Sequence, residues 1–175
     1  KGIYANSQGG DINIHVDGKI VAGTEGIKVV DNGGAGTNLR IDGDVTAGKT
    51  AIDIEKTGGT GELELTTDGA LSTTDTFNAI DIELNDSAAD LTVTTNDLVD
   101  GDVDLRHRRN SGADTTGADI KLNINNDLEG RIYAINSQGG DTDISLSEGA
   151  EFKPSGDQAP AIRVKASNSF EDTLG

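Results

Sequence analysis

Apolar and polar residues alternate along most of this chain, in short runs separated by glycine, asparagine and aspartate. Ile12, Ile14 and Val16 are separated by single polar residues, and Leu63 and Leu65 repeat the pattern. A period of two places successive side chains on opposite faces of an extended backbone, so these runs predict β-strands. A sustained period of 3.6 residues is absent from the sequence, so the pattern predicts no helix.

The apolar runs form a three-part unit that recurs along the chain. The first part of each unit begins at Ile3, Ile27, Ile52, Ile80, Val103, Ile132 and Ile162. The second part contains Ile12/Ile14, Leu39/Ile41, Leu63/Leu65, Leu91/Val93, Ile120/Leu122 and Ile144/Leu146. The third part is marked by Ile20, Val45, Leu71, Leu98, Leu128 and Phe152. Successive units are therefore 23 to 30 residues apart.

This repeat predicts the fold class. Residues 3–11 return as residues 132–141 with one inserted residue, which shows that the units are related. Three strands per unit without a helix are typical of an all-β solenoid, and we predict a right-handed single-stranded parallel β-helix of about seven coils with three short strands each. An antiparallel β-sandwich would explain the alternation and the glycine-rich turns, but not a three-part unit that recurs seven times.

The predicted coils also define corners and an inward column. Turn residues separate the second and third parts at Asp17-Gly18, Asp42-Gly43, Asp68-Gly69, Asn96-Asp97, Asn126-Asp127 and Glu148-Gly149. The inward column of the second part is expected to stack Ile41, Leu65, Val93 and Leu122. The loops between the first and second parts vary in length and are rich in glycine, and such an edge of a solenoid is the usual place for function.

Composition narrows the function classes. The 175 residues carry 14 Lys and Arg against 31 Asp and Glu, a net charge of -17, which opposes binding to nucleic acid or to an anionic membrane surface. The absence of cysteine excludes disulfide scaffolds and thiol chemistry. The sequence also lacks an apolar run of about 20 residues, so we expect no membrane insertion by this segment.

The repeat style resembles a known family. Residues 26–30, Gly-Ile-Lys-Val-Val, followed by residues 38–48, Asn-Leu-Arg-Ile-Asp-Gly-Asp-Val-Thr-Ala-Gly, resemble the passenger domains of Gram-negative autotransporters. The resemblance implies an exported β-helix at the bacterial cell surface or secreted, in a parent chain with a C-terminal outer-membrane β-barrel. Residues 1–175 are then one β-helix segment of a longer passenger, with a loop insertion at 106–118 and an irregular terminal coil at 156–175.

Acidic residues are the first candidates for chemistry. Asp53 and Glu55, like Asp81 and Glu83, are expected on one outward face of adjacent coils, where Asp104 extends the row. Paired carboxylates are the catalytic groups of glycosidases, but the same rows also form an ordinary solubilising face. A G-x-S-x-G serine motif is absent.

The corner aspartates and the histidines are weaker candidates. Stacked Asp17, Asp42 and Asp68 offer oxygen ligands for a weak calcium site, or are plain corner residues. His15 lies between Ile14 and Val16, so we expect it to face outward without a catalytic partner. We therefore predict neither a cofactor nor a metal cofactor.

One basic cluster interrupts the acidic chain. Arg106, His107, Arg108 and Arg109 are consecutive, and we expect them to open the longest loop, which extends to Ala118. Blocks of basic residues bind sulfated glycans or acidic protein surfaces. The cluster is our predicted binding site, and a solvated insertion that offsets the acidic body is the alternative.

Together these patterns favour a non-enzymatic protein that acts in adhesion, host-receptor contact or self-association. The expected partner is a host-surface protein or glycan, or another copy of the chain, and not nucleic acid. The alternatives are a polysaccharide hydrolase or lyase on the same scaffold, and a passive stalk for activity elsewhere in the parent chain.

Overall fold

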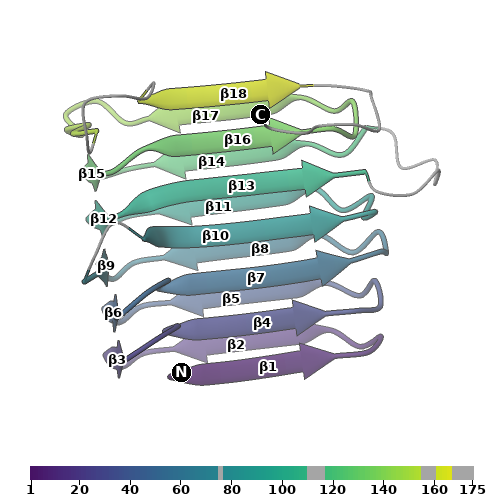
Figure 1. The fold of residues 1–175 in the computed structure, drawn as a ribbon, viewed down its shortest axis with the longest axis horizontal. Coiled ribbons are helices and arrows are strands. Elements are labelled where there is room, and N and C mark those ends of the chain that lie inside the picture. The colour runs from purple at the N-terminus through teal and green to yellow at the C-terminus, as the bar shows by residue number, and fades with distance from the viewer. Residues whose placement is uncertain (75–76, 110–116, 155–160, 167–175) are drawn as a thin grey trace.

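The chain folds into a stack of coils built from three parallel sheets, which confirms the predicted β-solenoid. The computed structural model describes residues 1–74, 77–109, 117–154 and 161–166. Within these residues, sheet A has seven strands, sheet B has six and sheet C has five. Figure 1 shows the coils rising from β1 to β18, with sheet A in front of sheet B and the short strands of sheet C at one side.

Each coil contributes one strand to each sheet along most of the stack. Sheet A consists of β1 (Ile3–Ser7), β4 (Ile27–Asp31), β7 (Ile52–Thr57), β10 (Asn78–Asn85), β13 (Asp102–Arg108), β16 (Ile132–Asn136) and β18 (Ile162–Ala166). Sheet B consists of β2 (Ile12–Val16), β5 (Thr37–Ile41), β8 (Leu63–Thr67), β11 (Leu91–Thr95), β14 (Ile120–Ile124) and β17 (Thr142–Leu146). Sheet C consists of β3 (Ile20–Ala22), β6 (Val45–Ala47), β9 (Leu71–Thr73), β12 (Val99–Asp100) and β15 (Leu128–Glu129).

The core lies inside the coils, where inward residues stack in register. Leu39, Leu65, Val93 and Leu122 form one column of sheet B and are at most 1% exposed. The prediction was wrong for Ile41, which pairs with Thr67 in the neighbouring column. A five-residue strand with alternating burial has three inward positions, and each position builds its own column.

One predicted position of sheet C also shifts by one residue. Val99, not Leu98, is in register with Leu71 and Leu128. Strands this short contain too little alternation to fix the register from the sequence. Phe152 continues the sheet C column beyond β15 through a single parallel bridge to Leu128.

Polar side chains form a hydrogen-bond ladder along the corner that follows sheet B. Ser147 Oγ donates to Asn125 Oδ1 at 2.7 Å, and Asn125 Nδ2 donates to Asn96 Oδ1 at 2.7 Å. Asn96 Nδ2 donates in turn to Asp68 Oδ1 at 2.6 Å. The corner column therefore contains Asn125 and Ser147, one residue before the positions that the sequence predicted at its last two corners.

The Asp-Gly corners of the early coils have a steric cause. A Cβ added to Gly43 would lie 2.4 Å from the carbonyl oxygen of Gly18, and one added to Gly69 would lie 2.4 Å from the carbonyl carbon of Gly43. Successive corners thus approach too closely for a side chain at these positions. This contact explains why glycine follows the corner aspartates Asp42 and Asp68.

The opposite corner, between sheets A and B, is lined on the inside by polar residues. Asp31, Lys56, Leu84, His107 and Asn136 form one register column, and all are 0% exposed. Two of them bind the backbone of the loop in the preceding coil: Lys56 Nζ donates to Ala35 O at 2.6 Å and Asn136 Nδ2 to Ala118 O at 2.9 Å. These hydrogen bonds hold the loop ends against the core.

The last described strand, and the absence of membrane-spanning helices among the described residues, complete the description of the fold. Within the predicted irregular coil at 156–175, Ile162–Ala166 form the regular strand β18 paired with β16, while residues 155–160 and 167–175 lie outside the described residues. The described parts of the chain contain no helix that is long and apolar enough to cross a membrane.

Candidate functional site

The outer face of sheet A presents a straight row of polar and aromatic side chains. Across successive strands this row reads Tyr4, Lys28, Asp53, Asp81, Asp104, Tyr133 and Arg163. A second row beside it contains Glu55, Glu83 and Arg106. The predicted alignment of Asp53, Asp81 and Asp104 is therefore confirmed, and cations that the sequence did not place there lie among them.

Lys28 neutralises the N-terminal part of the acidic row. Its Nζ lies 2.8 Å from Asp53 Oδ2 and 2.7 Å from Glu55 Oε1, across one coil boundary. Burial opposes the charged form of Lys28, but the hydrogen bonds to the two carboxylates outweigh burial and raise the pKa of Lys28. Lys28 therefore remains charged and bound to the row.

Burial has a different effect on the next two aspartates. It raises the pKa of both Asp81 and Asp104, although Arg106 opposes the rise at each carboxyl group. Asn78 Nδ2 also donates to Asp81 Oδ2 at 3.1 Å. Neighbouring parallel strands are about 4.8 Å apart, so two carboxyl groups with raised pKa values stand on adjacent coils.

The predicted basic cluster does not form a projecting positive patch. Arg106, His107 and Arg108 belong to strand β13 and do not open a loop. Arg106 forms an ion pair with Asp104, His107 points into the core, and Arg108 Nη1 lies 3.6 Å from Glu83 Oε1. The alternating pattern continues from Val103 through His107, and this period separates the basic side chains onto opposite faces.

The structure describes only part of the predicted loop insertion at 106–118. Arg109 follows β13, and residues 110–116 of the predicted insertion lie outside the described residues. His107 Nε2 lies 2.7 Å from the carbonyl oxygen of Ser87, and burial lowers the pKa of His107. The cluster thus contributes one structural histidine, and its arginines at 106 and 108 face carboxylates of the same chain.

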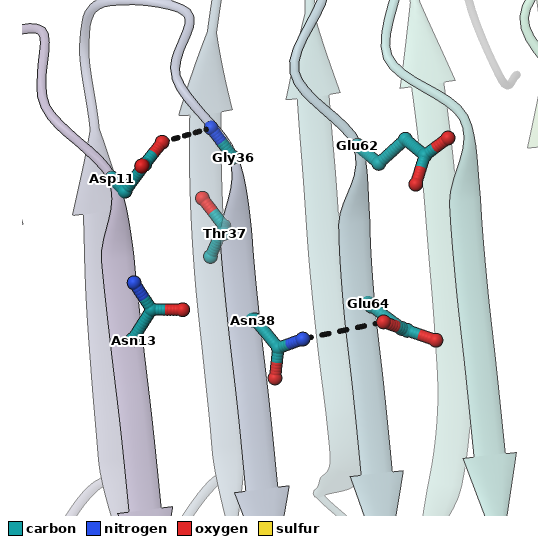
Figure 2. Close-up of a pocket in the computed structure, with 7 residues that line it drawn as sticks. All are labelled: Asp11, Asn13, Gly36, Thr37, Asn38, Glu62 and Glu64. Carbon is teal, nitrogen blue, oxygen red and sulfur yellow. Dashed lines mark hydrogen bonds between the residues drawn. The ribbon is translucent and has the colours of Figure 1, made fainter.

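A groove of about 240 Å³ crosses the outer face of sheet B. Its lining residues come from three successive coils and are Asp11, Asn13, Gly36, Thr37, Asn38, Glu62 and Glu64. Figure 2 shows the side chains of Asn13, Asn38 and Glu64 side by side on β2, β5 and β8, where they are in register. The groove therefore depends on which residues become neighbours across coils.

Hydrogen bonds fix part of the groove and leave other groups facing outward. Gly36 N donates to Asp11 Oδ1 at 3.0 Å, and Asn38 Nδ2 donates to Glu64 Oε2 at 3.2 Å (Figure 2). The lining contains three carboxylates, two carboxamides and no cation. Such a surface accepts hydrogen bonds from hydroxyl and ammonium groups. Sequence reasoning missed it because its outward polar residues are unremarkable until the register aligns them.

The corner aspartates lie in the predicted column, but only part of it gathers potential metal ligands. Asp68 is occupied by Arg40 Nη2 at 2.7 Å and by Asn96 Nδ2 at 2.6 Å. Asp17 and Asp42 instead converge on His15, which is exposed as predicted. The predicted calcium ligand set is thus not the set that the structure brings together.

Two outward polar faces, on sheets A and B, therefore carry the chemistry that the described residues offer for recognition. The groove on sheet B differs from the sheet A row because no lysine or arginine side chain is among its lining residues. Comparisons of the chain with protein-family models, with curated proteins and with solved structures found no match.

Proposed function

We propose that this chain is a non-enzymatic β-helical passenger segment of an autotransporter, displayed at the bacterial surface, where it acts in adhesion by binding a host-surface protein or glycan. The observation that supports the proposal is the groove across β2, β5 and β8. It places acceptor groups of three coils side by side on a rigid parallel sheet. The solenoid fold and the repeat style of the sequence agree with a passenger domain.

The groove favours a particular kind of ligand. The carboxylates of Asp11, Glu62 and Glu64 accept hydrogen bonds from sugar hydroxyls or from the ammonium groups of a basic peptide. The net charge of -17 attracts cationic partners and repels sulfated ones. Each hydrogen bond contributes only about 1 kcal/mol net, so single contacts are weak and display of many copies provides avidity.

A bead-binding experiment tests this proposal. Beads coated with the 175-residue chain are added to host-cell monolayers and to arrays of neutral and sulfated glycans. The triple variant Asn13→Ala, Asn38→Ala, Glu64→Gln removes two carboxamides and one negative charge from the groove. We expect it to reduce capture at least tenfold, as the loss or weakening of a few hydrogen bonds implies.

The matched control changes the same face on β14 and β17, two and three coils beyond β8. Asn123→Ala, Asp143→Asn and Ser145→Ala alter outward residues of these strands and are expected to retain capture. Equal loss in both triple variants, or none in the groove variant, contradicts binding at the groove. Capture by immobilised chain alone indicates self-association, and no capture at all indicates a passive stalk.

A second candidate function rests on the sheet A row. Asp81 and Asp104 have raised pKa values, and Asp104 is in register with Tyr133. A carboxyl group of raised pKa is suited to general acid catalysis. This arrangement supports a polysaccharide hydrolase or lyase. A glycan-degradation screen tests it: turnover that Asp81→Asn and Asp104→Asn each abolish favours the enzyme, and turnover that survives both substitutions, or no turnover, rejects it.

A further inference from the structure

Three potential metal ligands converge at the corner after β2, at the opposite end of that strand from the groove. His15 Nε2 lies 3.0 Å from Asp17 Oδ1 and 2.9 Å from Asp42 Oδ2. All three ligand atoms lie within 4.8 Å of one another. His15 and Asp17 belong to one coil and Asp42 to the next, so the register of β2 with β5 creates the cluster.

These short distances need a hydrogen atom or a cation between the three groups. Two carboxylate oxygens and the lone pair of an imidazole nitrogen would repel one another at such distances. A hydrogen on His15 Nε2, which one neutral tautomer and the imidazolium both carry, is directed at Asp42. That proton binds Asp42 directly and attracts Asp17 only through space, whereas a metal ion bonds to all three atoms.

We propose that His15, Asp17 and Asp42 form a binding site for a divalent transition-metal ion, with zinc as the best match. Zinc takes imidazole nitrogen and carboxylate oxygen together, at bond lengths of about 2.0–2.2 Å. Ligand atoms around tetrahedral zinc are then about 3.4 Å apart, so small movements of these side chains complete the site. Calcium is a poorer match because it takes six to eight oxygen ligands and no imidazole.

The neighbouring corner residues orient Asp42 for this role. Arg40 Nε lies 2.9 Å from Asp42 Oδ1, and its Nη2 lies 2.7 Å from Asp68 Oδ2. Asp68 is held in turn by the ladder that continues to Asn96. Arg40 therefore occupies one oxygen of Asp42 and leaves the other directed at His15. Outer partners of this kind fix metal-binding carboxylates, although the charge of Arg40 also limits the affinity for a cation.

Three protein ligands leave at least one position of a tetrahedral ion open to water. The metal site is independent of the proposed adhesive groove, because it uses none of the groove residues. Proton and metal compete for His15 Nε2, with Asp17, Asp42 and Arg40 as the charged groups that face it. Zinc binding is therefore expected to weaken in acid, because the ion binds only the deprotonated ring nitrogen.

The two histidines of the chain allow a direct test by NMR. Tag-free 175-residue chain is titrated with zinc chloride while the imidazole signals are recorded. We expect the signals of exposed His15 to change with one equivalent of zinc, and those of His107 to stay unchanged because His107 is fully buried. Unchanged His15 signals at saturating zinc, at a pH where its ring is neutral, would overturn the site.

Isothermal titration calorimetry of variants provides the second readout. His15→Gln and Asp17→Asn are exposed substitutions and are each expected to weaken zinc binding at least tenfold, since even outer-shell changes cost about 10–100-fold. Asp143→Asn removes one exposed carboxylate on the outer face of β17 and is the charge-matched control, with zinc binding unchanged. Zinc affinity that survives His15→Gln, or that falls equally in Asp143→Asn, assigns the ion to general acidic attraction and rejects the proposal.

Discussion

Lys56 Nζ donates a hydrogen bond to Asp31 Oδ2 between neighbouring coils, and both side chains are fully buried. Thr37 Oγ1 donates to the same aspartate oxygen at 2.9 Å, and Lys56 Nζ also donates to Ala35 O at 2.6 Å. The pair occupies the column that holds Leu84 on the next coil. An ion pair therefore stands where the solenoid accepts an apolar side chain.

Removing one partner of this pair should destabilise the fold strongly. Lys56→Leu leaves Asp31 buried without its cation, and we expect it to lower the free energy of unfolding by about 3–5 kcal/mol. Asp31→Leu should cost a similar amount for the reverse reason. Urea denaturation of the purified variants, followed by circular dichroism, measures both changes.

A double variant distinguishes the charge interaction of Asp31 and Lys56 from the packing of their side chains. Asp31→Leu with Lys56→Leu places leucine at both positions, as at Leu84, and buried ion pairs are often replaced by apolar residues at little cost. We expect the double variant to be clearly more stable than either single variant. Additive losses would instead show that the two charges do not stabilise each other.

The inward charges also show where the sequence was and was not informative. The period of two and the recurring unit predicted the strands, the sheets and the acidic row, because each depends on local alternation that repeats. Lys56 and His107 continue that alternation, but a charged residue is assigned outward by default. Their burial depends on acceptors such as Asp31 and Ser87, which only the register brings into contact.

The candidate sites also differ in whether the sequence could predict them. Asp53, Asp81 and Asp104 occupy equivalent positions in successive units, so counting along the sequence was enough to align them. The sheet B groove and the convergence of His15 with Asp42 depend on the direction of side chains from different coils. Those contacts have no local signal, and the basic cluster was misplaced because its composition outweighed its alternation.

Burial of His107 predicts a loss of stability in mild acid. Burial lowers the pKa of His107, while the hydrogen bond to Ser87 and the charge of Asp90 oppose the shift. The unfolded chain then binds a proton at His107 at higher pH than the native chain. The contribution of neutral His107 is therefore complete above its unfolded pKa of about 6.5, and is lost as the pH falls from there through the lower native pKa.

Urea midpoints measured from pH 8 to pH 5, in steps of about half a unit, test this prediction. His107→Asn replaces the histidine by asparagine, the residue found at the next position of the same column, Asn136. The variant should show a smaller fall in stability over that pH range. His15 remains unchanged in both chains and contributes with the opposite sign, because its native pKa is raised. An equally steep fall in the variant would contradict a role for His107.

Arg106 and Arg108 should differ in their effect on stability. Arg106 pairs with Asp104, which is 6% exposed, and it is also the cation that opposes the raised pKa of Asp81. Arg106→Ser removes that compensation and is expected to cost about 1–3 kcal/mol. Arg108→Ser breaks a looser contact at a partly exposed position and should cost no more than about 0.5 kcal/mol. Thermal unfolding of the two variants measures the difference, and equal midpoints would show that Arg106 lies in an ordinary solvated segment.

The two ends of the coil stack should bind each other. Ile162 and Val164 are 40% and 49% exposed, although the register places them on Ile132 and Ala134, which are 0% exposed. At the other end, Ile3, Ala5 and Ile14 are only partly buried, and β1 and β18 are the edge strands of sheet A. Exposed edges and apolar ends of a solenoid favour addition of another parallel coil, here supplied by a second copy.

Such contacts join different ends, so they generate open linear assemblies and not closed dimers. We expect the sedimentation coefficient of the 175-residue chain to rise with concentration, and Ile162→Lys with Val164→Lys to abolish the rise by placing charge at the junction. Val21→Lys is the matched control, because Val21 is 72% exposed but points away from the stack, and it should leave association intact. A monomer at every concentration, or equal loss of association in the Val21 variant, would show that the ends do not join and that the exposed apolar rim has another cause.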